Sequence, residues 1–465
     1  MELSKEQTPV ITAINVTETS RGVWNTFGSE ARSLVSLAVP LIAGWVSSAI
    51  VWLTSTYFLG PFGEVPLAAV SLTTSVLIIL FASLFGFLGP IGYFVGTAYG
   101  AGDATKISQV IKHGAMLGFV AGVIGFVFMA LALFALPYLG QPREVLEIIA
   151  PYWLLSGAVM IPFCIGFVYK QFYDAMDKAW TGVALTLVGV VVNVPLTWIL
   201  VTGQFGLPAL GLIGAGIASF VAACIGTAVM MAHFYYMPTH APYRAHVKWS
   251  KEGFIEQIRE GVPMGVQYFF EGGAVAVAGI LIGLLGATAL AANQVVFSVA
   301  GLLYMIPLGM SAAVGIRVAQ AAGGGEKERA RTIALTGMAM VSVWTVLFTI
   351  VLATQGEAIA RQFISETDVI AIATLMFIAI GAMQVFDGVQ STGVGALRGI
   401  FDNRYPTVVS LFAYWLISLP LSFAFGFVLN WGGPGVWTGF GVGLVIASVL
   451  LVRRLFRMTR VTANG

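Results

Sequence analysis

Twelve long apolar stretches constrain the fold of this chain more than any other feature of its sequence. A helix needs about 20 apolar residues to cross a bilayer. The stretches cover residues 34–59, 67–97, 112–138, 146–171, 181–203, 211–236, 257–285, 289–316, 331–353, 367–396, 405–430 and 435–455. Backbone polar groups find no water in the bilayer core, so a stretch of this length crosses it as a helix. The sequence therefore predicts an all-α polytopic membrane protein with twelve transmembrane helices.

The composition agrees with this class and excludes several others. Only 9% of the 465 residues are charged, and the mean hydropathy is +0.91. Soluble domains carry about 25% charged residues. The net charge of +2 is too small to indicate a nucleic-acid partner. The lipid bilayer is the partner that the composition indicates, and the sequence points to no obligatory protein partner and to no organic cofactor.

Basic residues predict the orientation in the membrane. With twelve spans, all of the 23 lysines and arginines except Arg143 and Arg361 fall on one side, Arg398 among them. Loops rich in lysine and arginine stay in the cytoplasm. We therefore expect a multi-pass protein of the plasma membrane, the bacterial inner membrane, with both termini in the cytoplasm.

The two halves of the chain repeat each other without gaps and at one constant offset. Val39-Pro40 recurs as Val262-Pro263, and a series of glycines follows the same register. The paired glycines are Gly60, Gly63, Gly86, Gly92, Gly100, Gly102 and Gly114 with Gly283, Gly286, Gly309, Gly315, Gly323, Gly325 and Gly337. Six spans per half give both halves the same direction. Such parallel repeats form two six-helix bundles related by a pseudo-two-fold axis, with a central cavity between the lobes.

The polar segments divide the chain into five parts. We predict an N-terminal cytoplasmic tail at 1–33 and an N-lobe at 34–236, which holds the first six spans. A cytoplasmic linker at 237–256 leads to a C-lobe at 257–456, which holds the last six spans, and a short tail covers 457–465.

Two carboxylates lie near the middle of predicted spans, Glu271 in the seventh and Asp387 in the tenth. A charge at the bilayer centre costs roughly 2.5–3.5 kcal/mol on insertion scales, and such residues mark ion or proton pathways. Neither span has a lysine or arginine near its acid, so we expect no structural ion pair. The acids can then hold a proton, or a sodium ion through their oxygen atoms. The alternative is a pair of protonated acids that hydrogen-bond neighbouring helices.

The repeat separates Glu271 from the shared fold. Its counterpart in the N-lobe is Ser48, so the fold itself does not require an acid at this position. Other polar and aromatic residues are candidates for an ion or substrate cavity, although each can equally serve helix packing. They are Gln267, Tyr268, Phe269, Phe270, Gln294, Gln384, Phe386, Gln390, Asn193 and Ser55.

No constellation of residues indicates an enzyme. Cys164 and Cys224 lie in apolar stretches without metal or redox spacing. The four histidines, His113, His233, His240 and His246, fall at helix ends or in the linker, and we expect them in solvent. No catalytic residue and no nucleotide-binding segment is predicted.

Several motifs make the chain resemble the multidrug and toxic compound extrusion (MATE) family, in its NorM-like branch. They are "LGPFGEVPLAAVSLTTS" from Leu59, "NVPLTWILVTGQFGLPALGLIGAGIAS" from Asn193, "FFEGGAVAVAGILIGLLGATALAANQ" from Phe269, "MSAAVGIRVAQAAGGGE" from Met310 and "FDGVQSTGVGALRG" from Phe386. Together they extend over essentially the whole chain.

The resemblance implies a function and a site. Members export cationic, often aromatic drugs in exchange for sodium ions or protons, without an organic cofactor. In the NorM-like branch, an acid in the seventh span and one in the tenth belong to the cation site, and these positions are Glu271 and Asp387. Many relatives carry a further aspartate in the first span, where this chain has "TSTYFLG" with Thr54 and Ser55. Asn193 is the remaining N-lobe candidate.

A second function remains open, that of a lipid-linked oligosaccharide flippase from the same broad superfamily. Such a carrier needs basic residues in its cavity to hold pyrophosphate. The apolar spans lack them, which favours the export of small cationic drugs or dyes.

Overall fold

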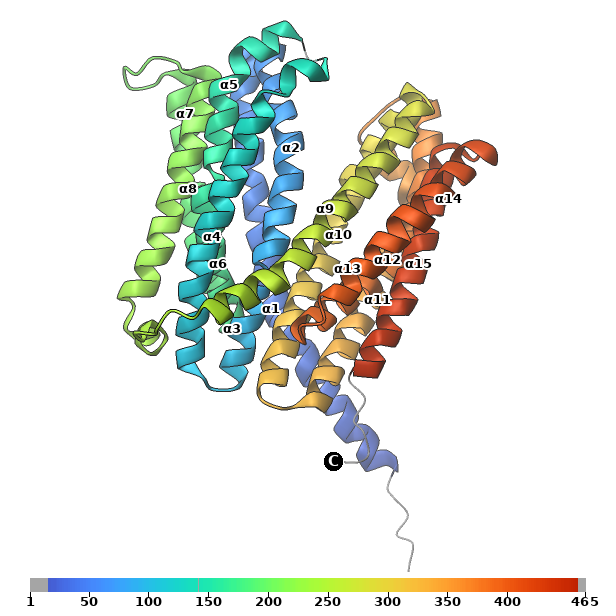
Figure 1. Cartoon of the computed structure of the whole chain (residues 1–465). Helices are drawn as coiled ribbons and strands as arrows, with labels where there is room; N and C mark the ends of the chain where they lie inside the picture. Colours follow the sequence, from blue (N-terminus) through green and yellow to red (C-terminus); the bar gives the residue numbers. More distant parts are fainter. Residues whose placement is uncertain (1–15, 141, 459–465) are drawn as a thin grey trace, which may run out of the picture.

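The computed structural model describes residues 16–140 and 142–458, which form two helical bundles. Figure 1 shows α1 to α8 in one bundle, the N-lobe, and α9 to α15 in the other, the C-lobe. The N-lobe consists of α1 (Val16–Leu59), α2 (Glu64–Leu88), α3 (Pro90–Gly100), α4 (Ala104–Leu133), α5 (Arg143–Ala158), α6 (Met160–Ala175), α7 (Ala179–Thr202) and α8 (Gly211–Tyr236). The C-lobe consists of α9 (Lys251–Leu284), α10 (Ala287–Gly323), α11 (Lys327–Ala360), α12 (Thr367–Gly399), α13 (Arg404–Leu411), α14 (Leu419–Phe423) and α15 (Gly432–Met458).

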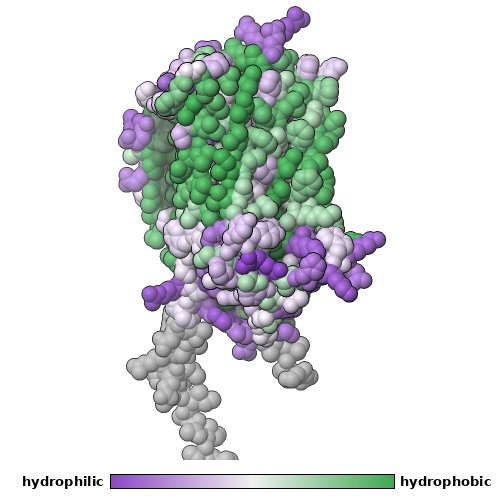
Figure 2. All heavy atoms as spheres, turned by 90° about the vertical axis from the view of Figure 1, so that its left-hand side faces the viewer, coloured by the Kyte–Doolittle hydropathy of each residue, from purple (hydrophilic) through white to green (hydrophobic). Residues whose placement is uncertain are grey.

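The helices have the lengths that a bilayer demands. Among the described residues, eleven helical segments are long and apolar enough to cross a membrane, and α1 comes in addition to them. Two of these segments are interrupted, one between α2 and α3 at Gly89 and one between α5 and α6 at Val159. Figure 2 shows a broad apolar band on the face of the N-lobe turned to the viewer, with polar residues gathered toward its two ends. The prediction of a polytopic all-α membrane protein is confirmed.

The two lobes meet at one end of the molecule and diverge toward the other (Figure 1). The meeting end, where α1 begins and α15 ends, is called the joined end below. Across it α2 packs on α9, and α1 and α3 pack on α10. Core side chains of both lobes contribute to one apolar cluster there, including Ile91 of α3 and Ile316 of α10.

Glycines let α3 and α10 approach backbone to backbone. A Cβ atom on Gly100 would collide with the carbonyl oxygen of Gln320, and one on Gly323 would collide with that of Thr97. Gly100 and Gly323 are repeat partners, and so are Thr97 and Gln320, because both pairs follow the offset that relates the two halves. The contact therefore obeys the pseudo-two-fold symmetry predicted from the sequence.

A polar latch adds to this contact at the joined end. Arg317 of α10 forms an ion pair with Asp177, which follows α6, at 2.9 Å. The amide of Gln320 donates to the carbonyl of Ala175 at 2.9 Å and to Asp177 at 3.2 Å. The latch joins the two lobes through side chains that the repeat does not share, since Asp177 has Ile400 as its counterpart.

The linker is held against the N-lobe, and two of its contacts correct the expectation about histidines. His240 of η3 (Pro238–Arg244) is 1% exposed and packs among Phe172, Tyr173 and Phe234. Burial, followed by the charge of Lys178, lowers the pKa of His240 to about 4. His113 of α4 is 1% exposed, and its ring lies 4.5 Å from that of Trp249. The prediction that these histidines lie in solvent is wrong for His113 and His240, because aromatic side chains cover both rings.

Candidate ion-coupling site

The structure brings the two membrane acids close enough to interact electrostatically. Glu271 lies in α9 and Asp387 in α12, and both side chains are half-buried. Within the described part of the chain, neither carboxylate forms an ion pair. Two like charges without a bound counter-ion repel each other in a medium of low dielectric constant. Such a pair gains stability when it shares a proton or a cation.

Two tyrosines complete the surroundings of the acid pair. Tyr304 of α10 and Tyr414 of η4 (Phe412–Ser418) each interact electrostatically with both carboxylates. The amide of Gln390 donates to the hydroxyl of Tyr414 at 2.6 Å, and the Tyr414 ring stacks on Phe440. Phenolic and amide oxygens are suitable ligands for a small cation. Oxygen-bearing side chains from α9, α10, α12 and η4 thus act on one another electrostatically in this region.

The backbone around Tyr414 departs from regular α-helix. Residues Phe412–Ser418 and Ala424–Val428 form π-helical turns on either side of α14. A π-helical turn adds a residue to the helix and is frequent at functional sites. Within the first of these turns, the indole of Trp415 donates to the carbonyl oxygen of Phe270 in α9 at 3.0 Å. The sequence pattern gave no signal for these turns.

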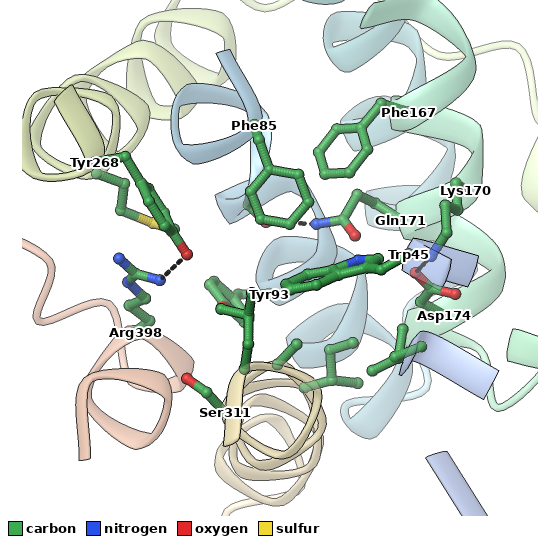
Figure 3. A pocket seen from close by; sticks show the side chains of 16 residues that line it. Trp45, Phe85, Tyr93, Phe167, Lys170, Gln171, Asp174, Tyr268, Ser311 and Arg398 are labelled. Atoms are coloured by element: carbon green, nitrogen blue, oxygen red, sulfur yellow. Dashed lines mark hydrogen bonds and ion pairs between the residues drawn. The ribbon is translucent and has the colours of Figure 1, made fainter. Parts of the chain in front are cut away.

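Arg398 lies beside the candidate site, which corrects the prediction that no basic residue is near the acids. Its side chain is only 5% exposed, although it had been assigned to the cytoplasmic side. It donates to the Tyr268 hydroxyl and to the Gln267 side-chain oxygen, both at 3.1 Å, and lies over the Tyr268 ring (Figure 3). Gln267 and Tyr268 precede Glu271 by one helical turn. Arg398 lies about three turns beyond Asp387 along α12, and its approach to α9 depends on how the two helices cross.

The other predicted residues divide into two groups. Gln267 is tied into the site region, since its amide also donates to Ser410, and Gln384 is buried one turn before Asp387. By contrast, Phe269 is 52% exposed and Phe386 is 40% exposed. Gln294 of α10 is exposed as well.

The N-lobe candidates are not joined to the acid pair by any contact among the described residues. Asn193 is buried in α7, and its amide donates to Ser219 of α8 at 3.5 Å. Ser55 is buried in α1. The counterpart of Glu271, Ser48, lies in the same helix, but its side chain is outside the described set. The structure therefore concentrates the candidate site in the C-lobe.

A small pocket between the lobes is lined in part by Arg398. Its walls are aromatic on the N-lobe side, with Trp45, Phe85 and Phe167 (Figure 3). Lys170 and Asp174, one helical turn apart on α6, form an ion pair at 2.5 Å in this wall. Both residues stand at the end of a predicted span, and the sequence analysis does not predict their ion pair. Their spacing of four residues is nevertheless typical of ion pairs on a helix.

Two repeated helical bundles that meet at one end, with unpaired acids inside one of them, define a membrane transporter fold. The MatE family model matches residues 40–199 and 263–424, and the two matches begin at repeat partners, Pro40 and Pro263. The chain belongs to the MatE family. This assignment confirms the resemblance seen in the sequence, and it is an assignment to a family of transporters, not enzymes.

Curated relatives support the assignment over nearly the whole length. A probable multidrug resistance protein NorM of Rhizobium meliloti is 30% identical over 94% of this chain and 95% of its own length. One from Xanthomonas axonopodis is 31% identical over 94% of this chain and 96% of its own length.

Solved structures share the fold. The eukaryotic MATE transporter AtDTX14 aligns with a TM-score of 0.82 at 24% identity, over 94% of this chain and 99% of its own. A MATE protein in a bent conformation aligns with a TM-score of 0.85 at 18% identity, over 94% of this chain and 97% of its own.

Proposed function

We propose that this chain is a secondary active multidrug efflux transporter that exchanges cationic or aromatic compounds for sodium ions or protons. The NorM relatives, named as probable multidrug resistance proteins, support the substrate class. The observation that carries the exchange mechanism is the acid pair Glu271 and Asp387, half-buried in the C-lobe without an ion-pair partner among the described residues.

The mechanism follows from competition for this negative charge. A proton or sodium ion that enters from outside cancels part of this negative charge, and the C-lobe then holds a cationic drug in the adjoining cavity less tightly. After the lobes open to the other side, the coupling ion leaves and the pair again attracts a cationic drug. Each charge that moves down the membrane potential supplies about 2.3 kcal/mol per 100 mV.

The basic residues support an orientation for this cycle. We place the joined end and both termini on the cytoplasmic side of a bacterial inner membrane, since lysine and arginine concentrate there. The described state, whose lobes diverge at the opposite end, is then the state closed toward the cytoplasm. The Arg317–Asp177 ion pair and the contact of α3 with α10 close that side.

Reconstituted protein tests the proposal. Proteoliposomes loaded with ethidium receive either a sodium gradient alone or a proton gradient alone, and dye efflux is followed by fluorescence. Glu271→Gln and Asp387→Asn should each reduce gradient-driven efflux at least about 100-fold, as expected when residues that act as a unit are removed. The matched controls are Glu252→Gln in the first turn of α9 and Asp368→Asn in the first turn of α12, both exposed. Intact efflux in both acid variants would disprove the proposal.

The flippase alternative receives partial support from one observation. Arg398 and Lys170 line the interlobe pocket, which corrects the prediction that the spans lack basic residues. Lys170 is neutralised by Asp174, so a single unpaired guanidinium remains for a pyrophosphate. The same liposomes decide between the functions, because a flippase would move a fluorescent lipid-linked pyrophosphate between leaflets without an ion gradient.

A further inference from the structure

A row of side-chain hydrogen bonds ties α9 to the segment that follows α12. Each bond joins one residue of α9 to Asn403 or to a residue of α13 or η4. The bonded pairs are Glu260 with Asn403 at 2.8 Å, Pro263 with Thr407 at 2.9 Å, Gln267 with Ser410 at 3.1 Å and Phe270 with Trp415 at 3.0 Å. The last of these pairs lies at the turn of α9 that carries Glu271.

The spacing of the bonded residues shows what the π-helical turn of η4 does. Along α9 they are three or four residues apart, as on one face of an α-helix. Along the second segment the last step, from Ser410 to Trp415, is five residues. A regular α-helix would bring Tyr414 to this face, but a π-helical turn holds one more residue and brings Trp415 there instead.

Tyr414 contacts the other acid-bearing helix. Its hydroxyl accepts a hydrogen bond at 2.6 Å from the amide of Gln390, which follows Asp387 by three residues on α12. Two consecutive residues of η4 therefore hold the two helices that carry the acids, Trp415 on α9 and Tyr414 on α12.

Trp415 holds the peptide group that leads into Glu271. Its indole donates to the carbonyl oxygen of Phe270, and the same peptide group contains the backbone nitrogen of Glu271. The indole also lies against Gly273, because a Cβ atom added there would come within 3.4 Å of its Cζ2. Two glycines follow Glu271, and glycine is the poorest helix former after proline. This turn of α9 therefore depends on a contact from outside the helix.

We propose that Trp415 is a positioning residue that holds Glu271 where it and Asp387 bind the same coupling ion. The inference rests on the function proposed above and adds a residue that acts on the ion only through Glu271. The loss of a residue that supports a cation ligand typically lowers the affinity for the cation about 10- to 100-fold. Because Trp415 is uncharged, its replacement leaves the charge of the site unchanged.

Trp415→Phe tests this role, because it removes the indole N–H and keeps an aromatic ring. The concentration of the coupling ion that half-saturates ethidium efflux should rise about tenfold, with a much smaller change in the maximal rate. Equilibrium binding to the detergent-solubilised protein, measured with radioactive sodium or as proton uptake in a pH titration, should weaken by the same factor. Trp153→Phe is the matched control in the N-lobe, since this buried indole also donates to a backbone carbonyl, that of Met129 at 2.7 Å. It should leave the affinity for the coupling ion unchanged.

Two substitutions in α9 approach the same contact from the other side. Gly273→Val pushes the indole away from α9 without replacing it, and it should also weaken ion binding. Gly272→Ala adds a methyl group that meets no atom within 4 Å, so it strengthens the helix without a new contact. In combination with Trp415→Phe it should restore part of the lost ion affinity.

The inference is overturned if the ion affinity is unchanged in whichever of Trp415→Phe and Gly273→Val folds. It is equally overturned if Trp153→Phe weakens ion binding as much as Trp415→Phe does, or if Trp415→Phe lowers only the maximal rate. These results would leave the proposed function in place, which fails only if the Glu271 and Asp387 variants keep gradient-driven efflux.

Discussion

The two lobes are alike where they touch and different where the chemistry lies. At the joined end, Gly100 and Gly323 make equivalent backbone contacts across the pseudo-two-fold axis. Inside the lobes, the same repeat register sets Ser48 against Glu271 and Cys164 against Asp387. Arg398 has Ala175 as its counterpart. The repeated glycines thus build the backbone contact between the lobes, and unrepeated positions place the unpaired acids in only one of them.

The symmetric interface and the asymmetric acid pair therefore have separate roles. A pseudo-symmetric interface can open and close without favouring either lobe, and small residues on both sides of it suit this motion. Ion coupling needs only one site, and a second charged site would add the cost of another buried charge. The apolar replacement Cys164, which is fully buried, agrees with an N-lobe that serves mainly as a packing partner.

The largest effect on the conformational equilibrium should come from the interface glycines. Gly100→Ala and Gly323→Ala each place a methyl group against a backbone carbonyl oxygen, which cannot move without shifting a helix. Overpacking of this kind costs about 1–3 kcal/mol, or roughly a 5- to 150-fold change in the equilibrium between states. Both variants should shift the protein away from the state closed at the joined end, and by similar amounts.

Spin labels on the two lobes measure this shift. Trp180→Cys and Lys327→Cys supply the labelling sites in a chain from which Cys164 and Cys224 have been removed, because both positions are exposed near the joined end. Double electron–electron resonance should give longer distances in the two alanine variants. Gly301→Ala is the matched control on α10, because no atom lies within 4 Å of its added methyl group. If only one of the two variants changes the distance, the interface is not functionally symmetric.

The smallest effect should come from the N-lobe. Asn193→Ala removes the amide that contacts Ser219, and an interhelical hydrogen bond in a membrane protein contributes about 0.6 kcal/mol on average. We expect gradient-driven ethidium efflux within about threefold of that of the unaltered chain. A loss of efflux in Asn193→Ala comparable to that of Glu271→Gln would show that the N-lobe holds part of the coupling site.

Much of the fold could be predicted from the sequence because the constraint is simple. Span length, the repeat offset and the parallel arrangement follow from apolar stretches and glycine positions. Glu271 and Asp387 could be identified because a carboxylate in an apolar span raises the free energy of membrane insertion and is therefore rare without a function. That the two acids act as a pair is predicted from their lack of a basic partner, and the family resemblance implies the same.

The parts that could not be predicted depend on how helices cross. Arg398 stands near the end of its span and was therefore assigned to the cytoplasmic side, but α9 brings Gln267 and Tyr268 to it. His113 lies inside α4 and His240 in η3 of the linker, and only the packing of the linker against the N-lobe reveals that both are buried. The π-helical turns around Tyr414 have no pattern in the sequence, and in the structure η4 packs against α15 and α9.

The most direct test of the central claim, that ion coupling resides in the acid pair of the C-lobe, compares two transport modes in one double variant. Glu271→Gln/Asp387→Asn protein is reconstituted, and ethidium exchange without any ion gradient is measured beside ethidium efflux driven by an ion gradient. The account predicts that the uncharged site binds ethidium more weakly, so exchange at a saturating ethidium concentration continues at a rate within about tenfold of that of the unaltered chain, while gradient-driven efflux falls to the level of empty liposomes. Gradient-driven efflux that persists in the double variant would contradict the account.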